Sequence, residues 1–227
     1  MTKRLLQTYL QDPGVYIHFM ILGAALIVGV LNYDHWMLAA FVGGWISYVV
    51  QEHLVHRYIF HAPAPKNQFW FNALYRLHYG HHDQVHNVHL LFTPLWFSIG
   101  LGIANIAVMA LFLPLPHAIV FVYGGGVMSY LVFEWMHLLS HFNAPNRGPV
   151  ALWVTRRHAR HHFIDYENWF TVSPGGQWVD QALGASPDHP EKAPNVRTCG
   201  LEPDDPRLIQ ARVQFGSDMS LRGVGLA

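Results

Sequence analysis

The stretch that decides the fold is residues 36–61, WMLAAFVGGWISYVVQEHLVHRYIFH. Residues 36–50 form a largely apolar run, and the polar residues Gln51, Glu52 and His53 follow it directly. Two further histidines, His56 and His61, come within the next eight positions. An apolar helix that runs straight into imidazole side chains indicates a membrane helix whose end carries a metal-binding site.

Three more apolar segments accompany this one, at residues 15–31, 92–113 and 117–135. A helix needs about 20 residues, with a range of roughly 17 to 25, to cross a bilayer core. The last two segments have this length, and the first fits if its helix continues beyond the apolar run. Tight connections at residues 32–35 and 114–116 join the four segments into two hairpins. We therefore expect an all-α integral membrane protein with about four transmembrane helices.

The composition agrees with a lipid-facing surface and excludes several other classes of protein. Apolar residues make up 52% of the chain and charged residues only 12%, whereas soluble domains have about 25% charged residues. Lys+Arg and Asp+Glu both total 14, so no broad basic field for a nucleic-acid partner is expected. A single cysteine, Cys199, excludes a disulfide framework and a thiolate metal cluster. The 17 histidines exceed Lys and Arg together.

Basic residues near the ends of the apolar segments predict the orientation in the membrane. All of them fall on one side of the predicted bundle, and the two tight connections contain none. They are Lys3, Arg4, Arg57, Lys66, Arg76, Arg147, Arg156, Arg157 and Arg160. This side should be cytoplasmic. We expect a membrane-embedded domain with a cytosolic histidine-rich helical cap at residues 1–184, and a polar, surface-exposed tail at residues 185–227.

Ten histidines form four groups along the chain, with the patterns HxxxxH, HxxHH, HxxxH and HxxHH. They are His56, His61, His78, His81, His82, His137, His141, His158, His161 and His162. Residues three or four apart share a helix face, so His78 shares one with both His81 and His82. Adjacent histidines diverge by about 100° and suit two neighbouring ions. His56 and His61, about 140° apart, also suit two ions or a helix that ends between them. Ten imidazoles are too many for one metal ion and enough for two.

Other polar residues near these groups are candidates for supporting roles. Metal-bound imidazoles usually need an acceptor for their second nitrogen. Candidate acceptors are the acids Glu52, Asp83, Glu134, Asp165 and Glu167. We expect His53, His86 and His89 to support the ligands by hydrogen bonds or to lie at interfaces between elements. We interpret the isolated histidines His18, His35, His117 and His189 as ordinary solvated or hydrogen-bonded side chains.

Over about residues 36–185 the sequence resembles the fatty acid hydroxylase and sterol desaturase superfamily of membrane di-metal enzymes. The resemblance rests on residues 52–61, the two HxxHH boxes, NWFTV at 168–172, WVD at 178–180 and LG at 183–184. The HRxxFH form of the first box is most similar to the fatty acid 2-hydroxylase branch. Residues 83–87, DQVHN, lack the Lys-x-Pro sequence associated with that branch. The resemblance implies a four-helix membrane domain with a cytosolic cap. It also implies that the ten histidines hold two metal ions, with iron as the working metal and zinc as a possible substitute.

These observations predict an O2-dependent lipid hydroxylase. Two iron ions held by neutral imidazoles would activate dioxygen and convert a lipid C–H bond, with a fatty acyl chain favoured, into an alcohol. Electrons would come from a separate donor protein that docks on the cytosolic face. The histidines act as ligands and not as general bases. Four aromatic residues are candidates to line the lipid pocket: Trp36, Phe41, Trp45 and Phe92.

Three other functions remain open at the level of sequence. A desaturase, or a sterol or carotenoid oxygenase, would use the same two metal ions. A non-enzymatic metal transporter would require polar ligands within the spans, whereas these histidines gather on one side. A zinc hydrolase normally has fewer protein ligands and an open water position.

Overall fold

The computed structural model of the protein describes residues 2–142 and 148–216. Every regular element in these two ranges is a helix, which confirms the predicted all-α class. The elements in chain order are α1 (Thr2–Gln11), α2 (Pro13–Leu31), α3 (Trp36–Val55), η1 (His56–Phe60), α4 (Gln68–Leu74), η2 (Tyr75–Tyr79), α5 (Gly80–Asp83), α6 (Val88–Leu91), α7 (Leu95–Met109), α8 (Leu115–Ile119), η3 (Val120–Gly126), α9 (Val127–His141), α10 (Pro149–Phe163), α11 (Gln177–Ala182), η4 (Val196–Thr198) and α12 (Pro206–Phe215). Arg147, one of the basic residues used to predict the orientation, lies outside the described residues.

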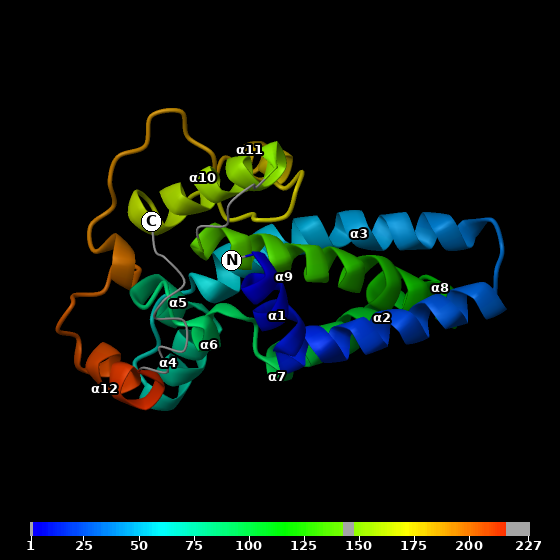
Figure 1. The fold of residues 1–227 in the computed structure, drawn as a ribbon, viewed down its shortest axis with the longest axis horizontal. Coiled ribbons are helices and arrows are strands. Elements are labelled where there is room, and N and C mark those ends of the chain that lie inside the picture. The colour runs from blue at the N-terminus through cyan, green and yellow to red at the C-terminus, as the bar shows by residue number, and fades with distance from the viewer. Residues whose placement is uncertain (1, 143–147, 217–227) are drawn as a thin grey trace.

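Long helices form one end of the molecule (Figure 1). By length and composition, three helical segments are able to cross a bilayer: Pro13–Leu31, Val88–Met109 and Leu115–His141. Helix α3 is the fourth long helix, and it extends five residues beyond the predicted apolar run, to Val55. Its C-terminal part contains Gln51, Glu52 and His53, which makes α3 less apolar than the other three. A bundle of four long helices is thus observed, and three of its helical segments are long and apolar enough to cross a membrane.

The two tight connections between these helices lie at the same end of the bundle. His117, directly after the second hairpin turn, places its Nε2 3.1 Å from both carboxylate oxygens of Asp34 in the first turn. Asp12 and Pro13 start α2, because the Asp12 carboxylate accepts a hydrogen bond from the Val15 backbone N–H at 3.1 Å. The short helices of the cap gather at the opposite end (Figure 1).

Two glycines allow α3 and η3 to pack with their backbones in close approach. A Cβ atom on Gly44 would lie 1.8 Å from the carbonyl oxygen of Phe121, and one on Gly125 would lie 1.8 Å from that of Phe41. Small residues at helix interfaces are typical of membrane bundles, where packing drives association because lipid tails are as apolar as the side chains. This contact holds the first hairpin against the last long helix.

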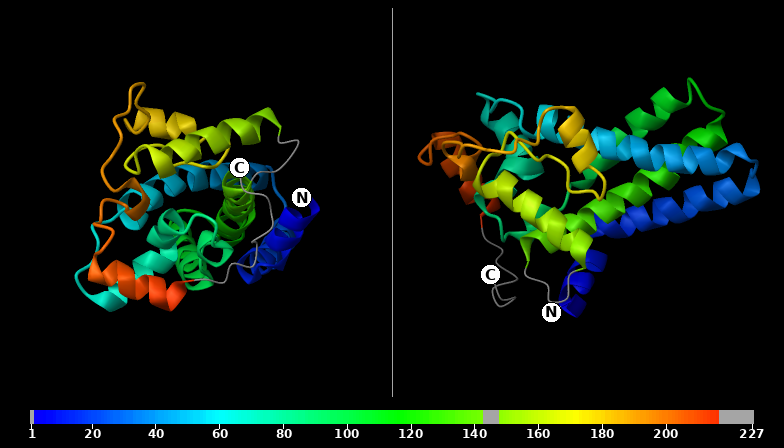
Figure 2. Two further views of the ribbon diagram at one scale, coloured as in Figure 1. Left: turned by 60° about the vertical axis from the view of Figure 1, so that its left-hand side comes forward. Right: turned by 90° about the horizontal axis from the view of Figure 1, so that it is seen from above.

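The C-terminal segment folds onto the cap, contrary to the predicted surface-exposed tail. Helix α12 lies against α4 (Figures 1 and 2). Leu208 and Ala211 are 1% and 0% exposed, and they pack in one core with Phe71 and Tyr75. The sequence prediction weighted the many prolines and acids and overlooked the helical spacing of Leu208, Ala211 and Phe215. Residues 217–227 of the predicted tail lie outside the described ranges.

Candidate metal centre

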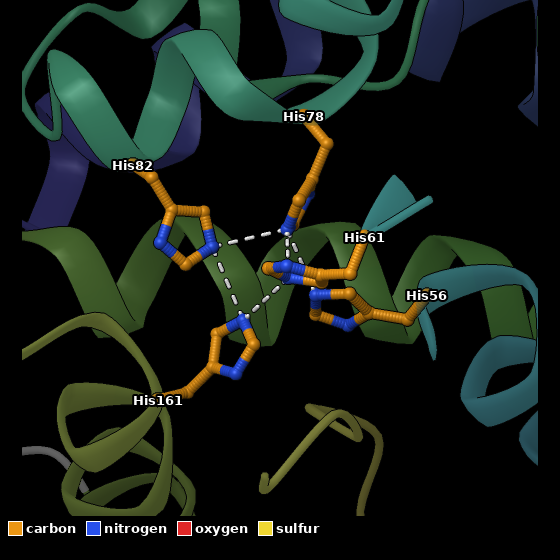
Figure 3. Close-up of side chains that lie close together, drawn as sticks. All are labelled: His56, His61, His78, His82 and His161. Carbon is orange, nitrogen blue, oxygen red and sulfur yellow. Dashed lines mark hydrogen bonds between the residues drawn. The ribbon is translucent and has the colours of Figure 1, made fainter. Parts of the chain in front are cut away.

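The ten predicted histidines gather in two groups of five. We call the first group site A; it contains His56, His61, His78, His82 and His161. We call the second group site B; it contains His81, His137, His141, His158 and His162. Within each site, one nitrogen from each ring lies within 4.8 Å of the corresponding nitrogens of the other four. Figure 3 shows the five imidazoles of site A converging from three sides.

Each HxxHH box serves both sites. In the first box His78 and His82 belong to site A and His81 to site B, whereas in the second box the assignment is reversed. In each box it is therefore the histidines four apart that share a site, and those three apart do not. The adjacent histidines diverge to different sites, as predicted. This interleaving brings the sites side by side, with the rings of His82 and His162 stacked at a centroid distance of 4.0 Å.

A π-helical turn brings His56 and His61 into one site. The segment η1 (His56–Phe60) is π-helical, and the His61 backbone N–H donates to the His56 carbonyl at 3.0 Å. A π turn repeats after about five residues, so residues i and i+5 lie on the same face. The sequence predicted two ions for this pair or a helix that ends between them. The first alternative assumed α-helical geometry and is corrected by this turn, which brings both rings to site A. Their rings are stacked at 5.1 Å.

The Nε2 atoms of each site lie so close together that hydrogen bonds among them cannot account for all of the contacts. In site A the Nε2 atom of His78 lies 2.8 Å from that of His61, 2.9 Å from that of His56 and 3.0 Å from that of His82. A neutral imidazole carries one N–H, so most of these contacts bring lone pairs together. A cation among the five nitrogens would accept all of these lone pairs. Imidazole donors without carboxylates suit zinc, copper, iron or nickel, so the residues of both sites fit a transition metal ion.

Burial keeps the imidazoles of the cap neutral and able to act as ligands. Removal from water lowers the pKa of His56, His61 and His78 well below the ordinary value, and neighbouring imidazoles lower it further. The same two causes act on His81, His82, His158 and His162. Burial lowers the pKa of His161 to about 4, against an opposing hydrogen bond to the Asn168 carbonyl. Neutral rings are the form that binds metal ions.

Backbone carbonyls orient three of the ligand rings. The Nδ1 atom of His56 contacts the carbonyl oxygen of Phe170, that of His161 contacts Asn168 O at 2.7 Å, and that of His141 contacts Val85 O at 3.0 Å. A proton on Nδ1 leaves the Nε2 lone pair directed at the site.

The predicted carboxylate acceptors contact other groups. Glu52 accepts from the backbone of Val172 and Ser173, and Glu134 accepts from the backbone of Thr93. Asp83 binds Arg212 at 2.7 Å, and Glu167 is exposed. Asp165 accepts a hydrogen bond from the Asn168 side chain at 2.6 Å, so it shapes the turn that presents the Asn168 carbonyl to His161. Within the described ranges no carboxylate is hydrogen-bonded to any of the ten histidines, and the prediction of direct acceptors is wrong. Short loops supply peptide carbonyls at these positions instead.

Asp180 is the supporting residue that the sequence analysis missed. Its fully buried carboxylate accepts from His53 Nδ1 at 2.7 Å, from Arg157 at 2.6 Å and from the Thr171 hydroxyl at 2.7 Å. Thr171 follows Phe170, whose carbonyl orients His56, so Asp180 connects α3, α10 and the loop beside site A. The WVD sequence at 178–180 contributed to the family resemblance, but its spacing did not reveal this contact.

The remaining histidines lie outside both sites. His53 is buried against Asp180, in agreement with a supporting role, whereas His86 and His89 are exposed. His18 Nδ1 contacts its own helix at the Gly14 carbonyl at 2.7 Å, and His117 pairs with Asp34. His35 and His189 are exposed.

A cavity of about 190 Å³ leads from the bundle to site A. It follows α3 from Gly44 to His56 and is bounded on another side by α7, which has no buried residue. Apolar side chains, among them Phe60, Phe97 and Phe133, form much of its wall. None of the four aromatic residues predicted to line the lipid pocket does so: Trp36, Phe41, Trp45 and Phe92. Trp36 is 62% exposed near the turn between α2 and α3, and Phe92 is buried in the core.

A second, much smaller cavity of about 10 Å³ touches both sites. Its wall contains His56 and His78 of site A together with His81 and His137 of site B. A space of this size holds about one water-sized molecule.

Comparison with known proteins relates the chain to fatty acid 2-hydroxylases. The enzyme named fatty acid 2-hydroxylase of Macaca fascicularis is 30% identical over 139 residues, which is 59% of this chain and 36% of the relative. The Homo sapiens enzyme of the same name is 27% identical over an equal length. A dihydroceramide fatty acyl 2-hydroxylase of Arabidopsis thaliana is 28% identical over 125 residues, 54% of this chain and 50% of the relative. The chain thus spans a third to a half of the length of these curated relatives.

A solved structure has the same fold. Full-length Scs7p, of which only the hydroxylase domain is visible, superposes with a TM-score of 0.67 and 22% identity. The match covers 79% of this chain and 66% of that one. No family model matches the chain. The relatives and this structure together confirm the resemblance to the fatty acid 2-hydroxylase branch.

Proposed function

We propose that this relative of the fatty acid 2-hydroxylases inserts oxygen from O2 into a C–H bond of a lipid, with a fatty acyl chain as the favoured substrate. The observation that carries the proposal is the position of site A. One of its five imidazoles, that of His56, lines a largely apolar cavity among the long helices. A metal centre that borders such a cavity suits chemistry on a hydrocarbon chain.

Two iron ions would occupy sites A and B, each held by five histidines, and zinc would fit the same donors. Iron supplies the redox chemistry that O2 activation needs. One oxygen atom enters the C–H bond and the other leaves as water, which consumes two electrons and two protons. Because iron is not a net source of electrons, a separate donor protein provides them. The small cavity between the sites is lined by histidines of both sites and holds about one water-sized molecule.

The residues of this chain position the lipid and exclude water. Phe60, Phe97 and Phe133 surround the path toward His56 with apolar surface. Burial keeps the pKa values of the cap histidines low, so these rings act as ligands and not as proton acceptors at neutral pH. The peptide carbonyls that contact His56 and His161 hold these two rings in place.

The site is expected on the cytoplasmic side of the membrane. Arg57, Arg156, Arg157 and Arg160 lie in or next to the cap, at the end of the bundle that carries the histidines. The turns at the opposite end contain no Lys or Arg. The positive-inside rule therefore supports a cytosolic cap that a soluble electron donor is able to reach.

The test compares the lipids of cells that express the wild type with those of cells that express His161→Ala, both grown under ¹⁸O-labelled dioxygen. We expect one ¹⁸O atom in a hydroxylated acyl chain for the wild type and none for the variant. His189→Ala is the matched control, because His189 is exposed and outside both sites. Lipids that lose two hydrogens without gaining oxygen would establish a desaturase instead. A lipid profile that is the same for the wild type and His161→Ala would contradict the proposal.

A further inference from the structure

An amide pair interrupts the apolar wall of the cavity. The Gln51 side chain donates to Asn105 Oδ1 at 3.0 Å, and the Asn105 side chain donates to Gln51 Oε1 at 3.0 Å. Gln51 lies on α3 and Asn105 on α7, and both residues line the cavity. Since α7 packs mainly on η3 and α8, the pair spans a place where α3 and α7 face each other across the cavity.

The pair leaves hydrogen-bonding capacity unused. Each side-chain amide has two N–H groups and two acceptor lone pairs. The reciprocal contact uses one donor and one acceptor of each residue, so one N–H and one lone pair remain on both Gln51 and Asn105. A plain hydrocarbon chain that passes this point would cover these groups without offering them a partner, which weakens binding.

Further polar residues continue the same two helix faces. Ser47 is one turn before Gln51, and Ser98 is two turns before Asn105; both line the cavity. Positions four or seven apart lie on one face of a helix. Polar side chains of α3 and α7 thus face the same cavity, whose lining also includes His18, Glu52 and Thr93, and this differs from a channel adapted only to methylene groups.

The pair lies at a defined distance from site A. Gln51 precedes His56 by five residues, a rise of roughly 7.5 Å along the helix axis. A polar group at this distance from the reacting carbon would therefore come next to the amides.

We propose that Gln51 and Asn105 bind a hydroxyl or carbonyl oxygen on the lipid, so that the protein selects an oxygenated chain over a plain one. This inference rests on the proposed function, because it takes site A as the reacting centre. Both a hydroxylated or keto fatty acyl chain and a hydroxylated sterol carry this chemistry.

The test measures lipid binding as well as reaction. Purified full-length protein is titrated with octadecanoate, with a series of its hydroxy and keto positional isomers, and with a hydroxylated sterol, in competition with one labelled lipid. We expect about 10-fold tighter binding of the best oxygenated acyl isomer than of octadecanoate. The variant Gln51→Met with Asn105→Leu should lose this preference and bind octadecanoate at least as tightly as the wild type.

Two further variants separate recognition from helix packing. Gln51→Asn with Asn105→Gln retains an amide on each helix and should retain the discrimination. Ile103→Leu, on the exposed side of α7, should leave unchanged the affinity for octadecanoate and the affinity for the best oxygenated isomer.

The possible outcomes decide between the proposals. A wild type that binds plain and oxygenated chains equally would overturn the inference. The inference would also be overturned if Gln51→Met with Asn105→Leu weakened the binding of plain and oxygenated chains by the same factor. The amide pair would then only join α3 to α7. If the protein bound the hydroxylated sterol more tightly than every acyl isomer, the amides would still be the oxygen-binding site, and its ligand would be a sterol. A wild type with no metal and no labelled product would contradict the proposed function itself, whatever the binding preference.

Discussion

Sites A and B contain the same five donors but differ in their surroundings. Site A takes two histidines from the π turn after α3, and its His56 borders the 190 Å³ cavity. Site B takes His137 and His141 from the regular helix α9; none of its five histidines lines the 190 Å³ cavity, and His81 and His137 border the 10 Å³ cavity. Identical donor chemistry therefore does not imply identical roles. Under the proposed function, the contact of His56 with this cavity assigns site A to the substrate.

Removing one histidine pair from each site should have the largest effect. We expect His78→Ala with His82→Ala to lose the ion of site A, and His158→Ala with His162→Ala to lose that of site B. Each double variant should retain one metal ion per chain, and hydroxylation should fall at least about 100-fold because both ions are needed. Metal content by mass spectrometry and product formation check this. His86→Ala, outside both sites, should retain two ions; retention of both ions in either double variant would refute the assignment.

Asp180→Asn should destabilise the protein and affect site A more than site B. The substitution removes the negative charge that faces Arg157, whose guanidinium is largely buried. Breaking a buried ion pair from one side costs about 3–5 kcal/mol. The loop that carries the Phe170 carbonyl, and with it His56, loses its anchor. Denaturant unfolding in detergent measures the stability, and metal occupancy measures each site.

A control for Asp180→Asn is Asp188→Asn, an exposed acid in the same part of the chain. It should leave both stability and metal content unchanged. Equal loss of metal from sites A and B in Asp180→Asn would show that the aspartate supports the cap as a whole and does not act on His56.

Deleting Tyr58 should weaken site A selectively. Tyr58 is 64% exposed within η1, and its removal converts the i to i+5 spacing of His56 and His61 into an α-helical i to i+4 spacing. His61 then occupies a different angular position, and we expect about 10- to 100-fold weaker metal binding at site A. Tyr58→Ala retains the chain length and should retain the affinity. Competition with a metal chelator measures the metal affinity of site A in both variants. An unchanged affinity after the deletion would show that the π turn is dispensable.

Of these changes, Gly44→Ala should have the smallest effect on the metal content of site A relative to that of site B. The added Cβ would meet the Phe121 carbonyl and force α3 away from η3. Overpacking of this kind costs about 1–3 kcal/mol. Because the contact lies in the bundle, we expect lower thermal stability with the metal content of both sites retained. Gly23→Ala, where nothing lies within 4 Å of the added Cβ, is the control and should be neutral or slightly stabilising.

Local periodicity was sufficient to identify the histidines four apart in the two HxxHH boxes, although His78 lies in the π-helical segment η2. Residues 78–82 and 158–162 each place histidines four apart on one face, and adjacent histidines diverge, as the structure shows. The apolar segments likewise indicated the long helices, since burial in lipid demands a long run of apolar residues. Periodicity failed at His56 and His61, because a π turn changes the angle per residue without a marked change in composition.

Long-range contacts were inaccessible to the same reasoning. Asp180 contacts His53 across 127 positions of the chain, and the carbonyl partners of the ligand histidines belong to the backbone, which every residue has. The cavity lining was missed because it depends on packing between helices: Phe41 packs with Met37, Ala40 and Val120, away from the cavity that Gln51 lines. The folded C-terminal segment was missed because its few apolar residues stand among many prolines and acids.

The sequence alone determined the class of fold, the membrane helices and the ten candidate ligands, since helix length, hydropathy and imidazole spacing are local properties of the chain. The tertiary structure decided how these histidines divide between sites A and B, which site meets the cavity, and which groups orient the rings. Those features depend on how helices distant in sequence pack against one another. Close backbone approach at Gly44 and Gly125, a wide turn at His56 and the buried charge of Asp180 determine that packing.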